Sequence, residues 1–325
     1  MHKPQVMLDS GAYTAFRLGR KIDINKYAEF VMEHGKEFAG CFNLDEINNT
    51  KKSYENWQYL KSLGAETIPV YHMVTGEDDY LKKYLKQTDF IALGAIANLD
   101  QNKRRQGLDR IWKDYLTDKK GKAICKVHGL GLTVIDQMTR YPWYSVDSFT
   151  PVISAVWGGI LLPKVKDDEF NYLGMEMCHI SDQGKPSPGN TSNWINYPRR
   201  LQMKYQELFE EKGFVLGDVF YKERRPTRKD KRLKREDPMS PLWNLRTPSD
   251  TEKHTIVNHW EERMRWNLTY WVELQRLIPQ VKMCMGVSTT THLSIFELVK
   301  PKLDILISYA YMSDDIYKEI GRAHV

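Results

Sequence analysis

The chain alternates between short apolar segments and longer amphipathic ones, and this alternation constrains its fold more than any other feature. A strand-like segment followed by a helix-like one, repeated, is typical of right-handed βαβ units built around a parallel sheet. The segments expected to form strands are 6–9, 40–44, 67–71, 90–94, 124–129 and 143–147. Helices are expected between them, near 23–34, 53–63, 78–86, 103–117 and 133–140.

The same pattern returns near the C-terminus, where strands are expected at 281–285 and 303–309 on either side of a helix at 292–299. The six strands expected in the first half of the chain and these two make eight. We therefore expect an α/β fold, a closed (β/α)8 barrel of the TIM type with a large insertion between the sixth and seventh strands. An open doubly wound sheet is the alternative, but no Gly-x-Gly-x-x-Gly motif follows the first strand.

The expected organisation has four parts. Residues 1–150 supply barrel strands one to six, residues 151–280 form the insertion, and residues 281–318 supply the last two strands. Residues 319–325 carry no fold signal and resemble a translated sequencing adapter, so we expect a non-native tail that replaces the natural C-terminus.

Three elements are expected within the insertion. An apolar segment at 151–163 reads as a strand or hairpin, and a helix near 192–212 should end at Gly213. A longer helix should open with the capping box formed by Ser249 and Glu252, and should bury one apolar face.

Composition sets the broad class of protein. With 325 residues, of which 41% are hydrophobic, the chain can bury a large core. No apolar stretch approaches the ~20 residues of a membrane span, and no signal-peptide pattern opens the chain. We therefore expect no membrane partner and a cytoplasmic location, while composition leaves the oligomeric state open. Four isolated cysteines, without a Cys-x-x-Cys pair, favour a reducing compartment.

Polar residues follow the successive apolar strands. Because the carboxyl ends of barrel strands meet on one face, an ordered set of such residues suggests a single site. Taken singly, each could be a solvated strand-end residue, a turn glycine or a core histidine. The set consists of Asp9, Asp45 with Glu46, His72, Gly94, His128 with Gly129 and Gly131, and Asp147.

Motifs at these strand ends resemble the tRNA-guanine transglycosylase superfamily. The resemblance is closer to its phage and bacterial DNA-modifying branch, the DpdA-type transglycosylases that insert 7-deazaguanines into DNA. It covers residues 5–165 well and the C-terminal strands loosely. The motifs are Asp-Ser-Gly-Ala (9–12), Asn-Leu-Asp-Glu (43–46), Ile-Pro-Val-Tyr-His (68–72), Ile-Ala-Leu-Gly-Ala (91–95), Lys-Val-His-Gly-Leu-Gly (126–131) and Tyr-Pro-Trp-Tyr-Ser-Val-Asp-Ser (141–148).

The resemblance implies that a guanine in DNA is exchanged for a 7-deazaguanine base such as 7-cyano-7-deazaguanine, without a cofactor, in the host cytoplasm if the gene belongs to a phage. By position, Asp147 matches the nucleophile, Asp9 the acid/base aspartate and Asp45 an acid that recognises the incoming base. His72 stands where the tRNA enzymes carry a glutamine. Further substrate contacts are implied for Ser10, Gly11, His72, Gly94, His128 and Gly129.

The chemistry suits these residue types. Breaking an N-glycosidic bond builds oxocarbenium character at the sugar, and a carboxylate on the opposite face can capture that centre. A second acid must protonate the departing guanine, and a third carboxylate can accept hydrogen bonds from a purine edge. Because the target base lies in a stack, it must be extruded from the helix or presented in a distorted or single strand.

Two features bear on metal and nucleic acid. The tRNA enzymes carry a zinc site of closely spaced cysteines, whereas only two cysteines follow the nucleophile in this chain, Cys178 beside His179 and Cys284 near His292, so we expect no metal. Between Lys222 and Arg235 there are nine Lys or Arg against two acids. A solvated loop is one interpretation, and phosphate contact is the preferred one. The expected contacts include Arg224, Arg225, Arg228, Lys229, Lys231 and Arg232.

The leading hypothesis is a DNA guanine transglycosylase. A tRNA-guanine transglycosylase is the alternative within the superfamily. A barrel glycoside or nucleoside hydrolase would use the same carboxylates to pass the sugar to water, and a non-catalytic nucleic-acid-binding barrel is the remaining possibility.

Overall fold

The computed structural model describes residues 5–73, 76–94, 99–181, 192–217, 254–299 and 303–308. They form two compact units. The first contains the residues up to Phe149 and those from Leu274 onward, and the second runs from Thr150 to Glu273. The basic segment between Lys222 and Arg235 lies outside the described residues.

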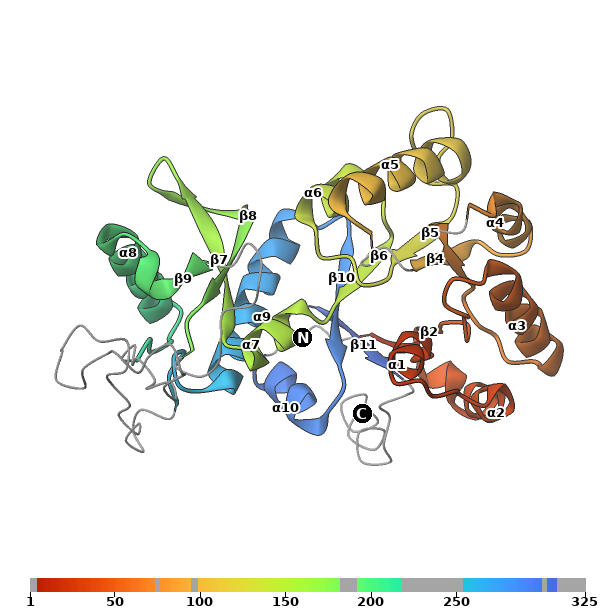
Figure 1. Ribbon diagram of the computed structural model, residues 1–325, viewed down its shortest axis with the longest axis horizontal. Coiled ribbons are helices and arrows are strands. Elements are labelled where there is room, and N and C mark those ends of the chain that lie inside the picture. The colour runs from red at the N-terminus through yellow and green to blue at the C-terminus, as the bar shows by residue number, and fades with distance from the viewer. Residues whose placement is uncertain are drawn as a thin grey trace, which may run out of the picture. The chain divides into compact units, whose positions relative to one another are not determined.

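The first unit is a mixed α/β structure around a curled parallel sheet of eight strands, which is compatible with a TIM-type fold (Figure 1). The sheet order is β2-β1-β11-β10-β6-β5-β4-β3. An isolated parallel bridge between Phe42 and Ile68 also joins the end of β2 to the chain entering β3. The strands are β1 (Val6–Asp9), β2 (Gly40–Cys41), β3 (Val70–His72), β4 (Phe90–Gly94), β5 (Lys126–Gly129), β6 (Ser145–Ser148), β10 (Lys282–Val287) and β11 (Asp304–Ser308).

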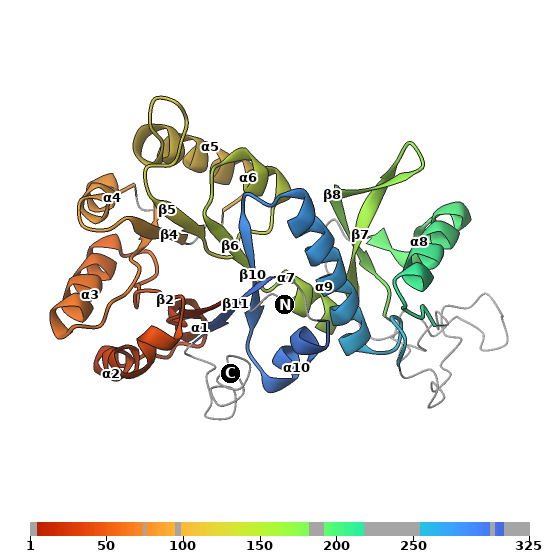
Figure 2. The ribbon, with the colours of Figure 1, turned by 180° about the vertical axis from the view of Figure 1, so that it is seen from behind.

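Helices connect these strands, and α2 to α6 lie around the outside of the curled sheet (Figures 1 and 2). Asp23, Asn49 and Asp100 each begin a helix by accepting a hydrogen bond from a backbone N–H of its first turn. The helices of this unit are α1 (Ala12–Arg17), α2 (Ile24–His34), the short η1 (Gly35–Glu37), α3 (Thr50–Leu63), α4 (Asp78–Leu85), α5 (Gln101–Ile111) with its continuation η4 (Trp112–Leu116), α6 (Ile135–Arg140) and α10 (Thr290–Val299).

The strands of the sheet are buried on both faces. One set of alternate residues forms a single apolar cluster that consists of Met7, Phe42, Val70, Ala92, Cys284 and Leu306. The residues between them, such as Leu8, Tyr71 and Leu93, are also fully buried. This two-sided burial explains why the strands read as continuous apolar runs in the sequence.

All eight strands expected from the sequence are present, so the predicted βαβ alternation is confirmed. Their bounds differ slightly. The ladder of β2 covers only Gly40 and Cys41, and β5 begins at Lys126, because the residues beside them pair through isolated bridges or turns.

The described residues of the second unit form a β-hairpin and three α-helices. The indole Nε1 of Trp266 donates to the carbonyl of Leu161 at 2.7 Å, and the Asn267 side chain accepts from the Leu161 N–H at 2.8 Å, so the long helix is fixed to the hairpin. The elements are α7 (Thr150–Val156), β7 (Gly159–Lys166), β8 (Glu169–His179), β9 (Ser192–Asn193), η5 (Trp194–Asn196), α8 (Arg199–Glu211) and α9 (Trp260–Leu277), whose last residues belong to the first unit.

Two expectations for this region are wrong. Residues 150–156 form a helix, and the strand begins only at Gly159. The long helix begins at Trp260, because residues 254–259 are not α-helical, while Ser249 and Glu252 lie outside the described residues. The helix expected near 192–212 is confirmed as α8, with Gly213 directly after its last turn. Within the described ranges, no helix is both long and apolar enough to cross a membrane.

Candidate functional site

The residues singled out from the sequence collect at one edge of the first unit's sheet. Asp9, His72, Gly94 and Gly129 are the last residues of β1, β3, β4 and β5, and Asp147 is the next-to-last residue of β6. Since all eight strands are parallel, these positions share the carboxyl edge of the sheet.

Asp147 is held through one of its two carboxylate oxygens. Its Oδ1 accepts hydrogen bonds from the backbone N–H of Gly131 at 2.8 Å and from Nε2 of His128 at 3.2 Å. Among the described residues, no hydrogen bond reaches Oδ2. The carboxylate is therefore oriented by two donors on one oxygen, and the other oxygen keeps its lone pairs for a different partner.

His128 lies below Asp147, inside the sheet. It pairs in register with Ser145, two residues before Asp147, and its side chain has no exposed surface. Its Nδ1 lies 2.7 Å from the Ser145 hydroxyl, and its ring packs on that of Phe42 with centroids 4.8 Å apart. The ring of His128 contacts Asp147 and Ser145, and the base contact expected for His128 stays a prediction.

Asp9 stands at a tight turn. The Gly11 N–H donates to Asp9 Oδ2 at 3.2 Å, and the Ala12 N–H donates to Ser10 Oγ at 3.3 Å. Gly11 has a left-handed φ of 78°, a conformation that side chains with a Cβ rarely adopt, and α1 begins directly after it. Ser10 is fully buried. Ser10 and Gly11 therefore shape the turn that carries the half-buried Asp9, and their expected substrate contacts stay predictions.

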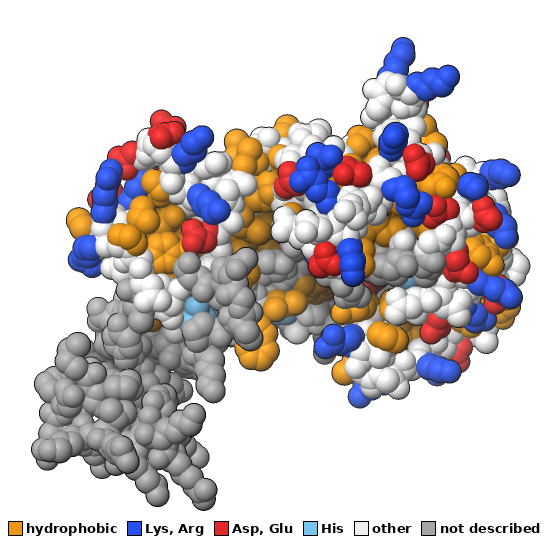
Figure 3. Space-filling view, turned by 45° about the horizontal axis from the view of Figure 1, so that its top comes forward, with side chains coloured by type: hydrophobic (Ala, Val, Ile, Leu, Met, Phe, Trp, Pro, Cys, Tyr) orange, Lys and Arg blue, Asp and Glu red, His pale blue; other side chains and the backbone are white. Residues whose placement is uncertain are grey.

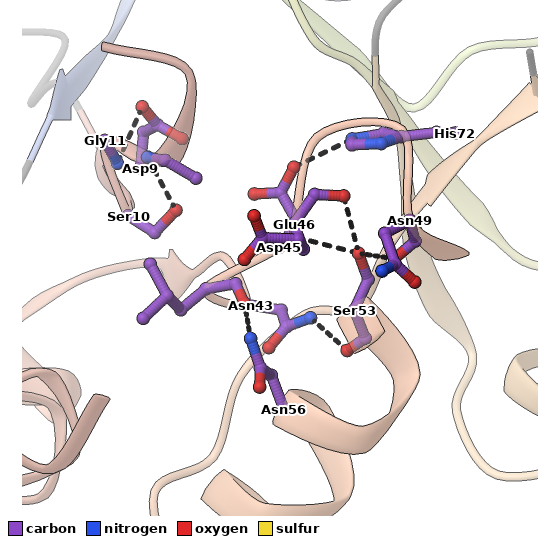
Figure 4. Close-up of polar contacts among 12 residues, drawn as sticks. Asp9, Ser10, Gly11, Asn43, Asp45, Glu46, Asn49, Ser53, Asn56 and His72 are labelled. Atoms are coloured by element: carbon purple, nitrogen blue, oxygen red, sulfur yellow. Dashed lines mark hydrogen bonds and ion pairs between the residues drawn. The ribbon is translucent and has the colours of Figure 1, made fainter. Parts of the chain in front are cut away.

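The side chains of Asp45 and His72 form a close polar contact that is largely buried. Oδ2 of Asp45 lies 2.7 Å from Nε2 of His72, and the two side chains are 9% and 2% exposed (Figure 4). The imidazole rests against Gly94, where an added Cβ would lie 2.6 Å from its Cδ2 atom. Gly94 is thus the residue that makes room for His72.

The loop that carries Asp45 is fixed to α3 by side chains that sequence reasoning missed (Figure 4). Asn43 donates from Nδ2 to the carbonyl of Ser53, and Asn56 donates to the carbonyl of Leu44, both at 2.9 Å. Ser53 Oγ accepts from the Glu46 N–H at 2.9 Å. Buried Ser and Asn three residues apart on one helix face were the available sequence signal, because such groups need partners.

Gly129 and Gly131 have separate roles. A Cβ on Gly129 would lie 3.1 Å from the Trp143 ring, so this glycine allows close packing of β5 against an aromatic side chain. Gly131 supplies the backbone N–H that holds Asp147. Its contribution could not be read from the sequence, since any residue except proline offers an N–H.

The cysteine thiols are poorly suited to act as nucleophiles, because the thiolate is the reactive form. Burial raises the pKa of Cys41 to about 12 and holds the pKa of Cys284 well above its usual value. Within the part of the chain that the structure describes, no three His, Cys, Asp or Glu side chains gather in a group that could hold a metal ion.

The described surface carries charges of both signs. On the face shown in Figure 3, Lys and Arg side chains are interspersed with Asp and Glu side chains. The residues expected to contact nucleic acid, between Arg224 and Arg232, lie outside the described ranges.

Comparisons with protein-family models, with curated proteins and with solved structures found no match to this chain.

Proposed function

We propose that this protein is a DNA guanine transglycosylase, which exchanges a guanine in DNA for a 7-deazaguanine base through a covalent aspartyl–sugar intermediate. The observation that carries the proposal is the hydrogen bonding of the Asp147 carboxylate. Two donors hold its Oδ1, and Oδ2 accepts no hydrogen bond from the described residues. A carboxylate oriented in this way is suited to attack a sugar carbon.

We also propose that the eight strands close into a (β/α)8 barrel. The Phe42–Ile68 bridge supports closure, with the Asn43 N–H donating to the Ile68 carbonyl at 2.8 Å. The strand registers support it further. When the registers are extended along each strand, Asp9 has a partner position on the neighbouring strand, that position has one on the next strand, and so on around the sheet. After one circuit through all eight strands, this series returns to β1 at position 17, eight residues beyond Asp9. A shift of eight residues is the shear of a TIM barrel.

In the first half of the reaction, Oδ2 of Asp147 bonds to C1′ of the deoxyribose as the bond from C1′ to N9 of guanine breaks. The guanine leaves with the bonding electron pair and takes a proton from the acid, for which Asp9 is the candidate. In the second half, the incoming base attacks C1′ and the ester bond to Asp147 breaks. The carboxylate regains its electron pair, and the proton of the incoming base passes to Asp9.

The Asp45–His72 pair is proposed to recognise the base. An acceptor oxygen and an imidazole side by side can meet the donor and acceptor edge of a guanine-type ring. The anchoring of this loop by Asn43, Ser53 and Asn56 favours recognition, because it keeps the pair rigid before the base arrives.

A nucleic acid is proposed as the polymer on the grounds of charge, and DNA is preferred to tRNA because the motifs resemble the DNA-modifying branch and the chain lacks the closely spaced cysteines of the tRNA enzymes. The segment from Lys222 to Arg235 carries nine basic and two acidic residues, so its surplus of seven exceeds the formal net charge of +6 of the entire chain. Positive charge concentrated in one segment is what phosphate binding requires.

Incubation of the protein with labelled guanine and either duplex DNA, single-stranded DNA or tRNA tests the function. Label should enter DNA, and unlabelled 7-cyano-7-deazaguanine should release it again. Label in tRNA alone would contradict DNA as the substrate and support a tRNA-guanine transglycosylase instead. Release of free base without incorporation would make the protein a hydrolase, and no change in any substrate would contradict the enzyme proposal. Asp147→Asn protein is the matched blank.

A further inference from the structure

Three side chains and one backbone group form a hydrogen-bonded series that ends on the proposed nucleophile. The hydroxyl of Ser145 lies 2.7 Å from Nδ1 of His128, whose Nε2 lies 3.2 Å from Oδ1 of Asp147. The Gly131 N–H completes the set at 2.8 Å. All three side chains are at least 96% buried.

The chemistry of the partners fixes the tautomer of the imidazole. Oδ1 of a carboxylate is an acceptor, so the ring nitrogen that faces it must carry a proton. A neutral ring that is protonated at Nε2 leaves Nδ1 as an acceptor, and the Ser145 hydroxyl can donate to it. Ser145 thereby favours the tautomer in which His128 donates to Asp147.

We infer that His128 is a positioning residue for Asp147: it donates from Nε2, in a tautomer set by Ser145, and acts with the Gly131 N–H to lock Oδ1 so that Oδ2 is the attacking atom. This inference rests on the proposed function. It assigns His128 to holding Asp147 from inside the sheet, whereas the sequence predicted a contact with the base.

The same donors assist both halves of the exchange. When Oδ2 bonds to C1′, Oδ1 becomes the carbonyl oxygen of the ester and keeps both hydrogen bonds. When the ester breaks, the electron pair returns to the carboxylate, and the two donors stabilise the charge as it forms. No proton leaves His128 in either step, so no additional base or acid is required.

The order Ser-His-Asp resembles a hydrolase triad, but the burial argues against one. Ser145 is 1% exposed, and Phe42 covers the imidazole ring. A substrate carbonyl has no route to this hydroxyl, and the end of the series that lies nearest the carboxyl edge is the aspartate.

Nitrogen-15 spectra of histidine-labelled full-length protein test the series without any need for activity. His128→Gln assigns the signals of His128 by difference. The wild type should show a proton on Nε2 and a bare Nδ1, and Ser145→Ala should lower the share of this tautomer. A proton on Nδ1 alone in the wild type would overturn the inference whatever the activity.

Kinetics test the positioning role. His128→Leu removes the donor at similar volume and should slow adduct formation and exchange about 10²-fold with an unchanged KM for the base. His128→Gln, whose amide can donate from a similar position, should recover most of the rate. The control is Gln137→Met, which also replaces a buried polar side chain with an apolar one and should leave exchange unchanged.

The outcomes separate the two claims. Full activity in folded His128→Leu, or no recovery in folded His128→Gln, contradicts the positioning role while the exchange function stands. Wild-type protein that exchanges no base contradicts the proposed function itself.

Discussion

Oδ2 of Asp45 and Nε2 of His72 lie 2.7 Å apart, and the imidazole ring occupies the space that a side chain on Gly94 would need. The pair therefore depends on a third residue that has no side chain. A glycine at the end of β4 is what allows two side chains from neighbouring segments to meet in a buried position.

Gly94→Ala should break this arrangement. The new Cβ would lie 2.6 and 2.8 Å from the Cδ2 and Nε2 atoms of His72, so the ring must shift and its contact with Asp45 should be disturbed. We expect a loss of about 1–3 kcal/mol in the free energy of unfolding, measured by denaturant titration, and a raised KM for the base. Gly107→Ala is the control, because its Cβ meets only the flexible end of Met73 and alanine favours the helix. Equal stability of the two variants would contradict the account of Gly94.

Asp147→Asn and Asp9→Asn should fail in different ways. The first keeps the shape but removes the attacking charge, so a denaturant-resistant protein–DNA adduct and turnover should both disappear. The second should slow exchange by about 10²–10⁴-fold while DNA affinity stays nearly unchanged. Gel analysis and filter binding measure these effects, with the exposed Asp136→Asn as control. Adduct formation by Asp147→Asn would place the nucleophile elsewhere, with Asp45 next in line.

Asp78 should make the free energy of unfolding of the first unit depend on pH in the acidic range. Burial acts to raise its pKa, but hydrogen bonds from Arg110, Tyr71 and Tyr115 outweigh burial and hold the pKa below its usual value. A carboxyl whose folded pKa is depressed stabilises the protein above the unfolded pKa of about 4, and this contribution is lost as the pH falls through the folded pKa.

Asp78→Asn should therefore lower the unfolding free energy at pH 7 by about 1–3 kcal/mol, since it disturbs hydrogen bonds to a charged group. The difference from wild type should shrink as the pH drops below 4. Denaturant titrations across this range measure it, and Asp79→Asn, in an exposed pair with Lys82, should differ little from wild type at any pH. A difference that stays constant with pH would contradict the assignment.

Neutralising Arg228, Lys229, Lys231 and Arg232 should weaken DNA binding and flatten its salt dependence. Each lost phosphate contact removes roughly 0.9 from the slope of log affinity against log salt. Base exchange at saturating DNA should change little. Neutralising Lys51, Lys52, Lys82 and Lys83 removes the same charge from α3 and α4 and serves as the control. An unaltered slope in the first variant would leave the segment without a role in binding.

The sequence predicted the sheet well because both faces of each strand are apolar and helix starts carry capping residues such as Asp23 and Asn49. It failed at residues 150–156, where Val152, Ile153 and Val156 suggested a strand although the segment is helical. β-branched residues favour strands only weakly, and tertiary packing decided otherwise.

The candidate site was predictable in its location but not in its contacts. Strand ends in a parallel sheet share an edge, so Asp9 and Asp147 could be placed together from the sequence alone. The pairing of Asp45 with His72, and of His128 with Asp147, depends on how far each side chain sits below that edge. That depth is set by the stagger between neighbouring strands, which no local pattern reveals.

The pairing of β1 with β11 has a consequence for synthesis on the ribosome. Asp9 pairs in register with Ser308, and the Gln5 N–H bonds to Asp304, which lies 299 positions later. Because translation proceeds at about 5–20 residues per second, β11 is synthesised roughly 15–60 seconds after β1. During that interval one side of the strand that bears Asp9 has no partner, so the nascent chain holds an open strand edge at the proposed site until β11 emerges.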